Sequence, residues 1–86
     1  MRHRANPRFW QCYRELPADV RRLADESYQL LRHDPHHPSL HFKRTGRLWS
    51  VRVGLHYRAL AVERGNDMVW FWVGPHALYD RLVAIG

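Results

Sequence analysis

The feature that most constrains the fold is a change of hydrophobic period at residues 34–38 (DPHHP). Before this segment, apolar residues recur every three or four positions, as on one face of a helix, whereas after it they alternate, as in a strand. The two prolines mark the boundary, because the residue before a proline resists the helical conformation. Helices gathered first and strands afterwards favour an α+β fold over an alternating βαβ fold.

Two helices are predicted before the boundary, at about residues 8–15 and 17–33. Proline is tolerated in the first turn of a helix, so Pro17 marks the start of the second helix and the two form an αα-hairpin. The preceding residues 1–7 (MRHRANP) are polar and basic. We expect them to be loosely held.

Four strands and a last helix are predicted after the boundary. The alternating segments are SLHFKR at 39–44, LWSVRV at 48–53, HYRALAVE at 56–63 and MVWFWV at 68–73. The last is apolar on both faces, which is typical of a central strand, and ERGND at 63–67 suits a hairpin turn. We therefore predict one domain over residues 1–86. Its sheet is small, mostly antiparallel and of about four strands, with two N-terminal helices on one face and a short C-terminal helix opened by Pro75.

The charge balance indicates a partner of opposite sign. Lysine and arginine total 14 against 8 acidic residues, a net charge of +6, and 13 of the 14 are arginine. Arginine pairs with phosphate through two parallel hydrogen bonds, so a polyanion or an acidic protein is the expected partner; solubility alone is the alternative.

The number of cysteines and the length of the apolar runs indicate the cellular compartment. Cys12 is the only cysteine, so no internal disulfide can form. The longest apolar run, Met68 to Val73, is too short to cross a membrane. We expect a soluble cytoplasmic protein without a membrane partner.

The candidate catalytic residues are Arg52, His56, Arg58 and His76. A period of two puts Arg52 on the face opposite Trp49, and His56 and Arg58 share a face of the next strand. Because burying arginine against the helices would be costly, we expect this face to meet solvent. Metal-independent cleavage of RNA needs an acid, a base and cations that stabilise the charge on the phosphate, and histidine and arginine can supply all three.

Further basic and aromatic residues are candidates for RNA binding. These are Lys43, Arg44, Arg47 and Tyr79, of which the tyrosine could stack on a base. Each candidate has a structural alternative: an arginine, for example, also occurs as an exposed strand residue or as one partner of an ion pair. For the four candidate catalytic residues, the shared face and the shared end of the sheet favour the functional interpretation.

A group of histidines around the boundary raises the question of a metal site. It consists of His33, Asp34, His36, His37 and His41. Two prolines interrupt the group, no cysteine joins it, and no pair of histidines four residues apart lies on a predicted helix, as known zinc motifs require. We predict no metal and no cofactor.

The chain resembles the RelE/ParE toxins of bacterial type II toxin–antitoxin systems. The resemblance covers about residues 8–83 and rests on the order of LPADVRRLADESYQLL, YRALAVE and VGPHALYD. It implies an antiparallel sheet with two helices on one face. Most family members also begin with a strand, and we expect that strand to be missing or vestigial here.

The resemblance also implies roles for residues and partners. Arg58 would stabilise the scissile phosphate, His76 would act as catalyst, and Tyr79 would be the aromatic beside it. One branch of the family cleaves mRNA, usually on the ribosome, and His76 favours that branch. Ser50 departs from the lysine that is usual in ribosome-dependent members. A gyrase inhibitor of the ParE type, or a non-toxic relative, is the alternative, and a cognate antitoxin is the expected partner in each case.

Overall fold

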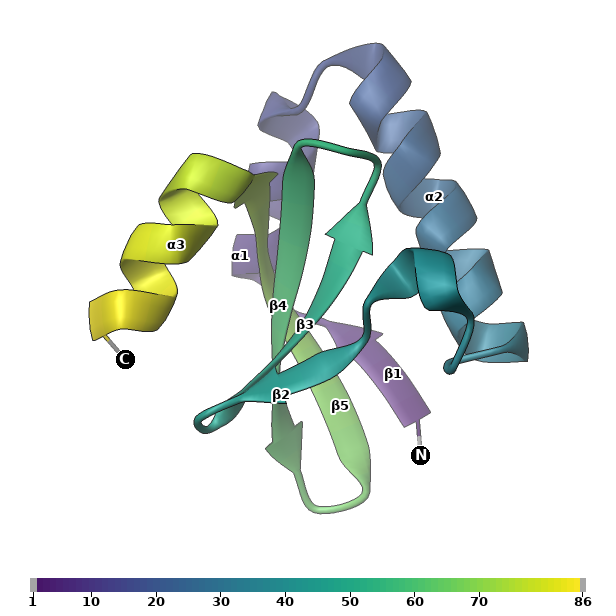
Figure 1. Cartoon of the computed structure of the whole chain (residues 1–86), viewed down its shortest axis with the longest axis vertical. Coiled ribbons are helices and arrows are strands. Elements are labelled where there is room, and N and C mark those ends of the chain that lie inside the picture. The colour runs from purple at the N-terminus through teal and green to yellow at the C-terminus, as the bar shows by residue number, and fades with distance from the viewer. Residues whose placement is uncertain (1, 86) are drawn as a thin grey trace.

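The computed structural model describes residues 2–85, and Figure 1 shows their arrangement. The helices are α1 (Pro7–Glu15), α2 (Ala18–His33), the short 3-10 helix η1 (Pro38–Leu40) and α3 (His76–Ile85). The strands are β1 (Arg2–Ala5), β2 (Lys43–Thr45), β3 (Leu48–Val53), β4 (Tyr57–Arg64) and β5 (Asp67–Pro75). The predicted α+β class is confirmed, as are the αα-hairpin and the C-terminal helix.

The strands form one sheet in the order β1-β5-β4-β3-β2. Strands β2 to β5 are antiparallel to their neighbours, and β1 alone pairs in parallel, with β5. Gly65 occupies the turn between β4 and β5 with φ of 60°, a conformation that glycine adopts at little cost. The apolar strand β5 has a neighbour on each side, as its sequence predicts.

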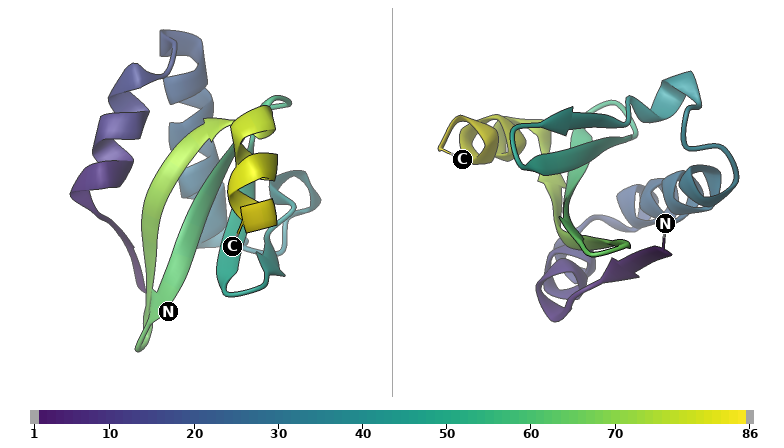
Figure 2. Two further views of the ribbon diagram at one scale, coloured as in Figure 1. Left: turned by 90° about the vertical axis from the view of Figure 1, so that its left-hand side faces the viewer. Right: turned by 90° about the horizontal axis from the view of Figure 1, so that it is seen from below.

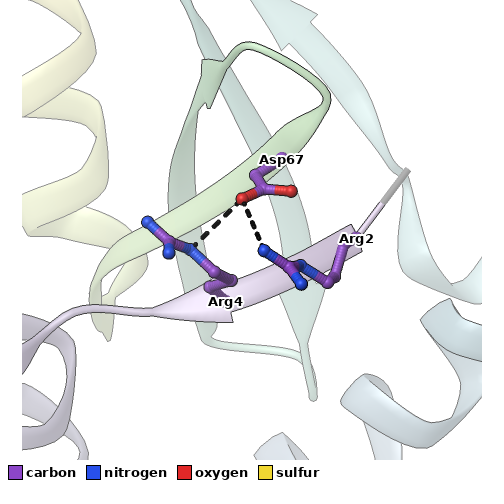
Figure 3. A network of polar contacts seen from close by, with 3 residues as sticks. All are labelled: Arg2, Arg4 and Asp67. Carbon is purple, nitrogen blue, oxygen red and sulfur yellow. Dashed lines mark hydrogen bonds and ion pairs between the residues drawn. The ribbon is translucent and has the colours of Figure 1, made fainter.

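The expectation that the first strand is missing or vestigial is wrong. β1 pairs along its length with β5, from Arg2 opposite Asp67 to Ala5 opposite Trp70. The side chains of Arg2 and Arg4 both reach Oδ2 of Asp67, at 3.3 and 3.5 Å, as Figure 3 shows. Residues 2–5 are therefore held by the sheet rather than loose.

The predicted strand over residues 39–44 is also wrong in its first half. Pro38–Leu40 form η1, and His41 follows with φ of 44° in the left-handed region. His37 Nδ1 accepts a hydrogen bond from the Ser39 amide at 3.2 Å, which caps this short helix. Strand β2 consequently begins at Lys43 and has only three residues.

The helices lie on both faces of the sheet. Figure 2 shows α1 and α2 on one side and α3 on the other. The larger core lies under α1 and α2 and includes Leu31, Val53 and Trp70. A smaller cluster under α3 joins Leu60 and Trp72 to Tyr79. The face opposite the hairpin is therefore partly covered by α3, and this helix forms part of the surroundings of the candidate site.

No helix within residues 2–85 is both long enough and apolar enough to cross a lipid bilayer.

Candidate functional site

The strand register gathers the basic residues on the α3 side of the sheet. Arg52 of β3 lies opposite Arg58 of β4, and Arg58 lies opposite Gly74 of β5. Lys43 of β2 lies opposite Ser50 of β3, two positions before Arg52. Because directly opposed residues and residues two apart share a face, all five belong to the face that α3 partly covers.

Arg58 is buried, which corrects the expectation that it faces solvent. Only 4% of its surface is exposed. Its Nη2 donates to Ser50 Oγ at 3.0 Å and to the His41 carbonyl at 3.3 Å, and its guanidinium lies 4.9 Å from the centre of the Tyr79 ring. Nε is buried and has no hydrogen-bond partner. Burial lowers the pKa of Arg58 from its ordinary value, although an arginine remains charged at neutral pH.

The reason for the burial is α3 and not the helical hairpin. The alternation of β4 correctly puts Arg58 on the face opposite α1 and α2, away from Ala59 in the larger core. Tyr79, from the first turns of α3, then covers the guanidinium. A period of two in one strand cannot reveal which later segment folds over its polar face.

Tyr79 is part of this cover and not an exposed stacking ring. It is 5% exposed, and its hydroxyl donates to Ser50 Oγ at 3.4 Å. Burial raises the pKa of the phenol, but hydrogen bonds with Ser50 and Thr45 and the positive charges of Arg58 and Lys43 outweigh burial and lower it overall. The predicted role of Tyr79 in stacking on a base would therefore require the ring to leave Arg58.

His41 connects Arg52 to Arg58. Its carbonyl accepts from Arg58, and its Nε2 lies 3.4 Å from Arg52 Nη1. The left-handed backbone at His41 accompanies these two contacts. The sequence drew attention to His41 only as a possible metal ligand. Its contact with both arginines could not be found from strand alternation, because the residue precedes β2.

His56 and His76 lie together at one end of this face. His56 is not in β4, as we predicted, but in the turn before it, and its carbonyl accepts from the His76 amide at 2.8 Å. Both side chains are exposed. His76 Nδ1 lies 3.2 Å from Asp80 Oδ2, one helical turn along α3. When Nδ1 is protonated and its N–H donates a hydrogen bond to Asp80, the lone pair of Nε2 remains free to accept a proton.

The basic residues predicted to bind RNA do not all share this face. Lys43 lies on it, opposite Ser50, and is exposed. Arg44 is the next residue, so it points to the other face, and its Nε donates to the Gly46 carbonyl at 3.0 Å. Arg47 is exposed in the turn between β2 and β3. The structure therefore brings Lys43 to Arg52 and Arg58, but not Arg44.

Acidic groups are scarce around the gathered cations. Among residues 2–85 the ion pairs are Arg2 and Arg4 with Asp67, and His76 with Asp80. None of them involves Lys43, Arg52 or Arg58. In the same part of the chain, no group of three or more histidine, cysteine or carboxylate side chains could hold a metal ion. The chemistry available here is that of imidazoles and guanidinium groups.

Comparison with known protein families matches residues 18–81 to the ParE-like toxin domain. The chain belongs to the RelE/ParE toxin superfamily. The match spans α2 to most of α3, and therefore includes all the candidate catalytic residues. A search of curated proteins finds no match for this RelE/ParE chain.

Solved structures of RelE toxins share the fold. A RelE–RelB complex from Methanococcus jannaschii aligns with a TM-score of 0.69 and 16% identity over 90% of this chain and 95% of that one. The archaeal RelE–RelB complex from Pyrococcus horikoshii aligns with a TM-score of 0.61 and 20% identity, over 86% of this chain and 92% of that one. The isolated E. coli RelE toxin aligns with a TM-score of 0.62 and 12% identity, over 99% of this chain and 98% of that one. At these identities the likeness establishes the fold.

Proposed function

We propose that this RelE/ParE chain is the toxin of a type II toxin–antitoxin system and that it cleaves mRNA in the cytoplasm, in association with the ribosome and without a metal. Residues 1–86 form one RelE-like domain in this proposal. The observation that carries it is the gathering of Lys43, Arg52 and Arg58 on one sheet face beside two exposed histidines. These cations have no carboxylate partner among residues 2–85, so a polyanion is their natural complement.

The histidines take the two proton-transfer roles in this mechanism. His76 Nε2 removes the proton from the ribose 2′-hydroxyl, with Asp80 holding the ring through Nδ1. The 2′-oxygen attacks the phosphorus, and the bond to the 5′-oxygen breaks. His56 gives that oxygen its proton, so the products are a 2′,3′-cyclic phosphate and a free 5′-hydroxyl.

The arginines stabilise the charge that develops on the phosphate. Arg52 is half-buried and offers its guanidinium at the surface. Arg58 lies beneath Tyr79, so it acts on the phosphate through its positive charge and not by direct contact. The burial of Arg58 strengthens its field, because charges interact more strongly away from water.

An antitoxin is the proposed protein partner. The RelE chains from M. jannaschii and P. horikoshii were crystallised with RelB. By analogy, this chain would bind an antitoxin with an acidic segment. The net charge of +6 would speed the encounter and favour a partner of opposite sign.

The test compares His76→Ala with the unaltered chain on purified mRNA, with and without ribosomes. Loss of a general base is expected to slow cleavage by about 100-fold or more. His33→Ala is the matched control, since His33 is also exposed but lies at the end of α2. Equal cleavage by the His76→Ala variant and the unaltered chain would remove His76 from the mechanism.

A non-catalytic inhibitor of DNA gyrase is the second candidate. Two observations favour it: the family match is to the ParE-like domain, and the arginine expected at the phosphate is buried. Gyrase supercoiling assays separate the two functions. Inhibition of supercoiling without any cleavage of mRNA would support the second candidate and contradict the first.

A further inference from the structure

A second basic surface lies on the opposite face of the sheet from Arg58. It is a cleft with a volume of about 590 Å³, bounded by β1, the end of α2 and the segment that leads to β2. Figure 1 shows these three elements converging near the N-terminus, away from α3. Arg2, His3, Arg32 and His36 line it, together with the ring of Tyr28. Its volume lies within the roughly 300–1,000 Å³ typical of ligand sites.

The cleft carries an excess of positive charge. No carboxylate of residues 2–85 lines it. Arg2 of the cleft shares the carboxylate of Asp67 with Arg4, as Figure 3 shows, so its positive charge is only partly neutralised, and Asp67 itself does not line the cleft. Arg32 adds a full charge, which exceeds the roughly half negative charge at the C-terminal end of a helix such as α2. The surface therefore attracts anions.

The aromatic ring in the cleft favours nucleic acid over an acidic peptide. Tyr28 is 41% exposed, and the Arg32 guanidinium lies 5.7 Å from its ring centre. An exposed tyrosine paired with an arginine plane offers a stacking surface for an unpaired base. Glutamate and aspartate side chains have no ring that could use it.

The cleft and the candidate site meet at one edge of the sheet. Phe42 lines the cleft, whereas the adjacent His41 contacts Arg52 and Arg58 on the other face. Strand β2 is the last in the sheet order, so no further strand separates the two surfaces at this edge. An extended strand of RNA could follow the positive charge from Arg32 around this edge to Arg52.

We propose that the cleft between β1, the end of α2 and residues 35–42 binds the sugar-phosphate backbone of single-stranded RNA that continues into the candidate site. This inference extends the proposed function and rests on it for the choice of RNA as the polyanion. Arg32 holds a phosphate, and Tyr28 receives a base.

The experiment measures binding of a fluorescent 2′-O-methyl RNA of about twelve nucleotides, which has no 2′-hydroxyl to react and spans more than one site. Arg32→Glu is compared with Arg22→Glu, which makes the same charge change at an exposed position of the same helix. Arg32→Glu is expected to weaken binding by about tenfold or more. It should also reduce the slope of log K against log salt by about 0.7, the value for one lost phosphate contact.

The outcomes separate this inference from the nuclease assignment. Equal weakening by Arg32→Glu and Arg22→Glu would overturn the inference, even if the chain cleaves mRNA. Competition by a poly-glutamate peptide as strong as that of unlabelled RNA would also overturn it, by assigning the cleft to acidic protein. Binding that depends on Arg32 in a chain that cleaves no mRNA would support the inference and contradict only the nuclease.

Discussion

Arg58 lies in an environment that is costly for a charged group. Its guanidinium is buried, its partners are neutral groups, and its Nε has no partner. The free-energy cost of removing a charged group from water is offset only when hydrogen-bond or ion-pair partners satisfy that group fully. We therefore interpret Arg58 as a residue kept for the proposed function rather than for stability.

The first prediction tests this interpretation with Arg58→Met. Replacing a buried ionic group by an apolar one of similar length is often neutral or stabilising, so we expect the free energy of unfolding to fall by no more than about 1 kcal/mol, or to rise. Urea unfolding measures it. Ser50→Ala is the control, because it keeps the charge but removes an acceptor, and it should cost about 1–3 kcal/mol. A loss of unfolding free energy clearly above about 1 kcal/mol for Arg58→Met would instead make Arg58 a structural residue.

The second prediction concerns His3 and pH. Burial, and then nearby positive charges including Arg32, lower the pKa of His3 below its ordinary value of 6.5. His3 Nδ1 accepts a hydrogen bond from Trp70 Nε1 at 3.1 Å, which requires an unprotonated Nδ1. The unfolded chain therefore binds the proton more readily, and the His3 contribution to stability is lost as pH falls from about 6.5 towards the folded-state pKa.

The measurement compares His3→Gln with the unaltered chain by urea unfolding at about pH 7.5 and about pH 5. Glutamine can keep an acceptor for Trp70 but cannot titrate. The variant should lose less stability than the unaltered chain between the two pH values. An identical loss in both chains would show that His3 is not the group responsible.

The candidate site was predictable in part, because strand alternation carries information about faces but not about later cover. The pattern of β3 and β4 correctly separates Arg52 and Arg58 from the larger core. It gives no sign that Tyr79 covers Arg58, that His41 bridges the two arginines, or that His56 belongs to a turn. These features depend on contacts between segments distant in sequence.

At the level of elements, the junction between β1 and α1 depends on Asn6. Its Oδ1 accepts a hydrogen bond from the Phe9 amide at 3.0 Å, and its own amide donates to the Trp70 carbonyl at 3.0 Å. The side chain therefore caps α1, while the backbone ends the pairing with β5. Pro7 follows at the first position of the helix, where a missing amide proton costs nothing.

The third prediction is that Asn6→Ala lowers the free energy of unfolding by about 1 kcal/mol, the usual cost of losing an N-cap. Asn6→Ser is the control, since serine also caps helices. Thermal unfolding followed by circular dichroism can rank the two variants and the unaltered chain. Equal loss for alanine and serine would mean that the cap hydrogen bond contributes little.

The long elements follow from local patterns, whereas the short ones do not. The helical period of residues 18–33 and the alternation of residues 48–53 identify α2 and β3 directly. Strand β1 has only four residues and pairs with a strand more than sixty positions away. No turn joins the two strands directly, so the local sequence does not indicate the pairing. In residues 38–41, proline and a left-handed His41 replace the strand that the alternation of SLHFKR suggests.

At the level of the whole molecule, β1 shields one edge of the sheet. Without it, the apolar strand β5 would present unpaired backbone groups along that edge, which is a known route to aggregation. A chain of this size has a small stability margin, and the loss of one strand consumes much of it.

The fourth prediction is that a chain beginning at Asn6 loses at least about 2 kcal/mol of unfolding free energy and aggregates at lower concentration. Urea unfolding and light scattering measure the two effects. Arg4→Lys in the full chain is the control, because it keeps the strand and its charge. Unchanged stability in the shortened chain would show that β1 pairs only weakly.

The pairing of Arg2 with Asp67 spans 65 positions of the chain. During synthesis, residues 2–5 leave the ribosome well before residues 67–70, with which they pair. Contacts of such long range form slowly, because a large loop must close before they gain any free energy. A nascent copy therefore cannot complete its five-stranded sheet until β5 has emerged as well, so β1 waits without its partner while α1, α2 and the other strands are made.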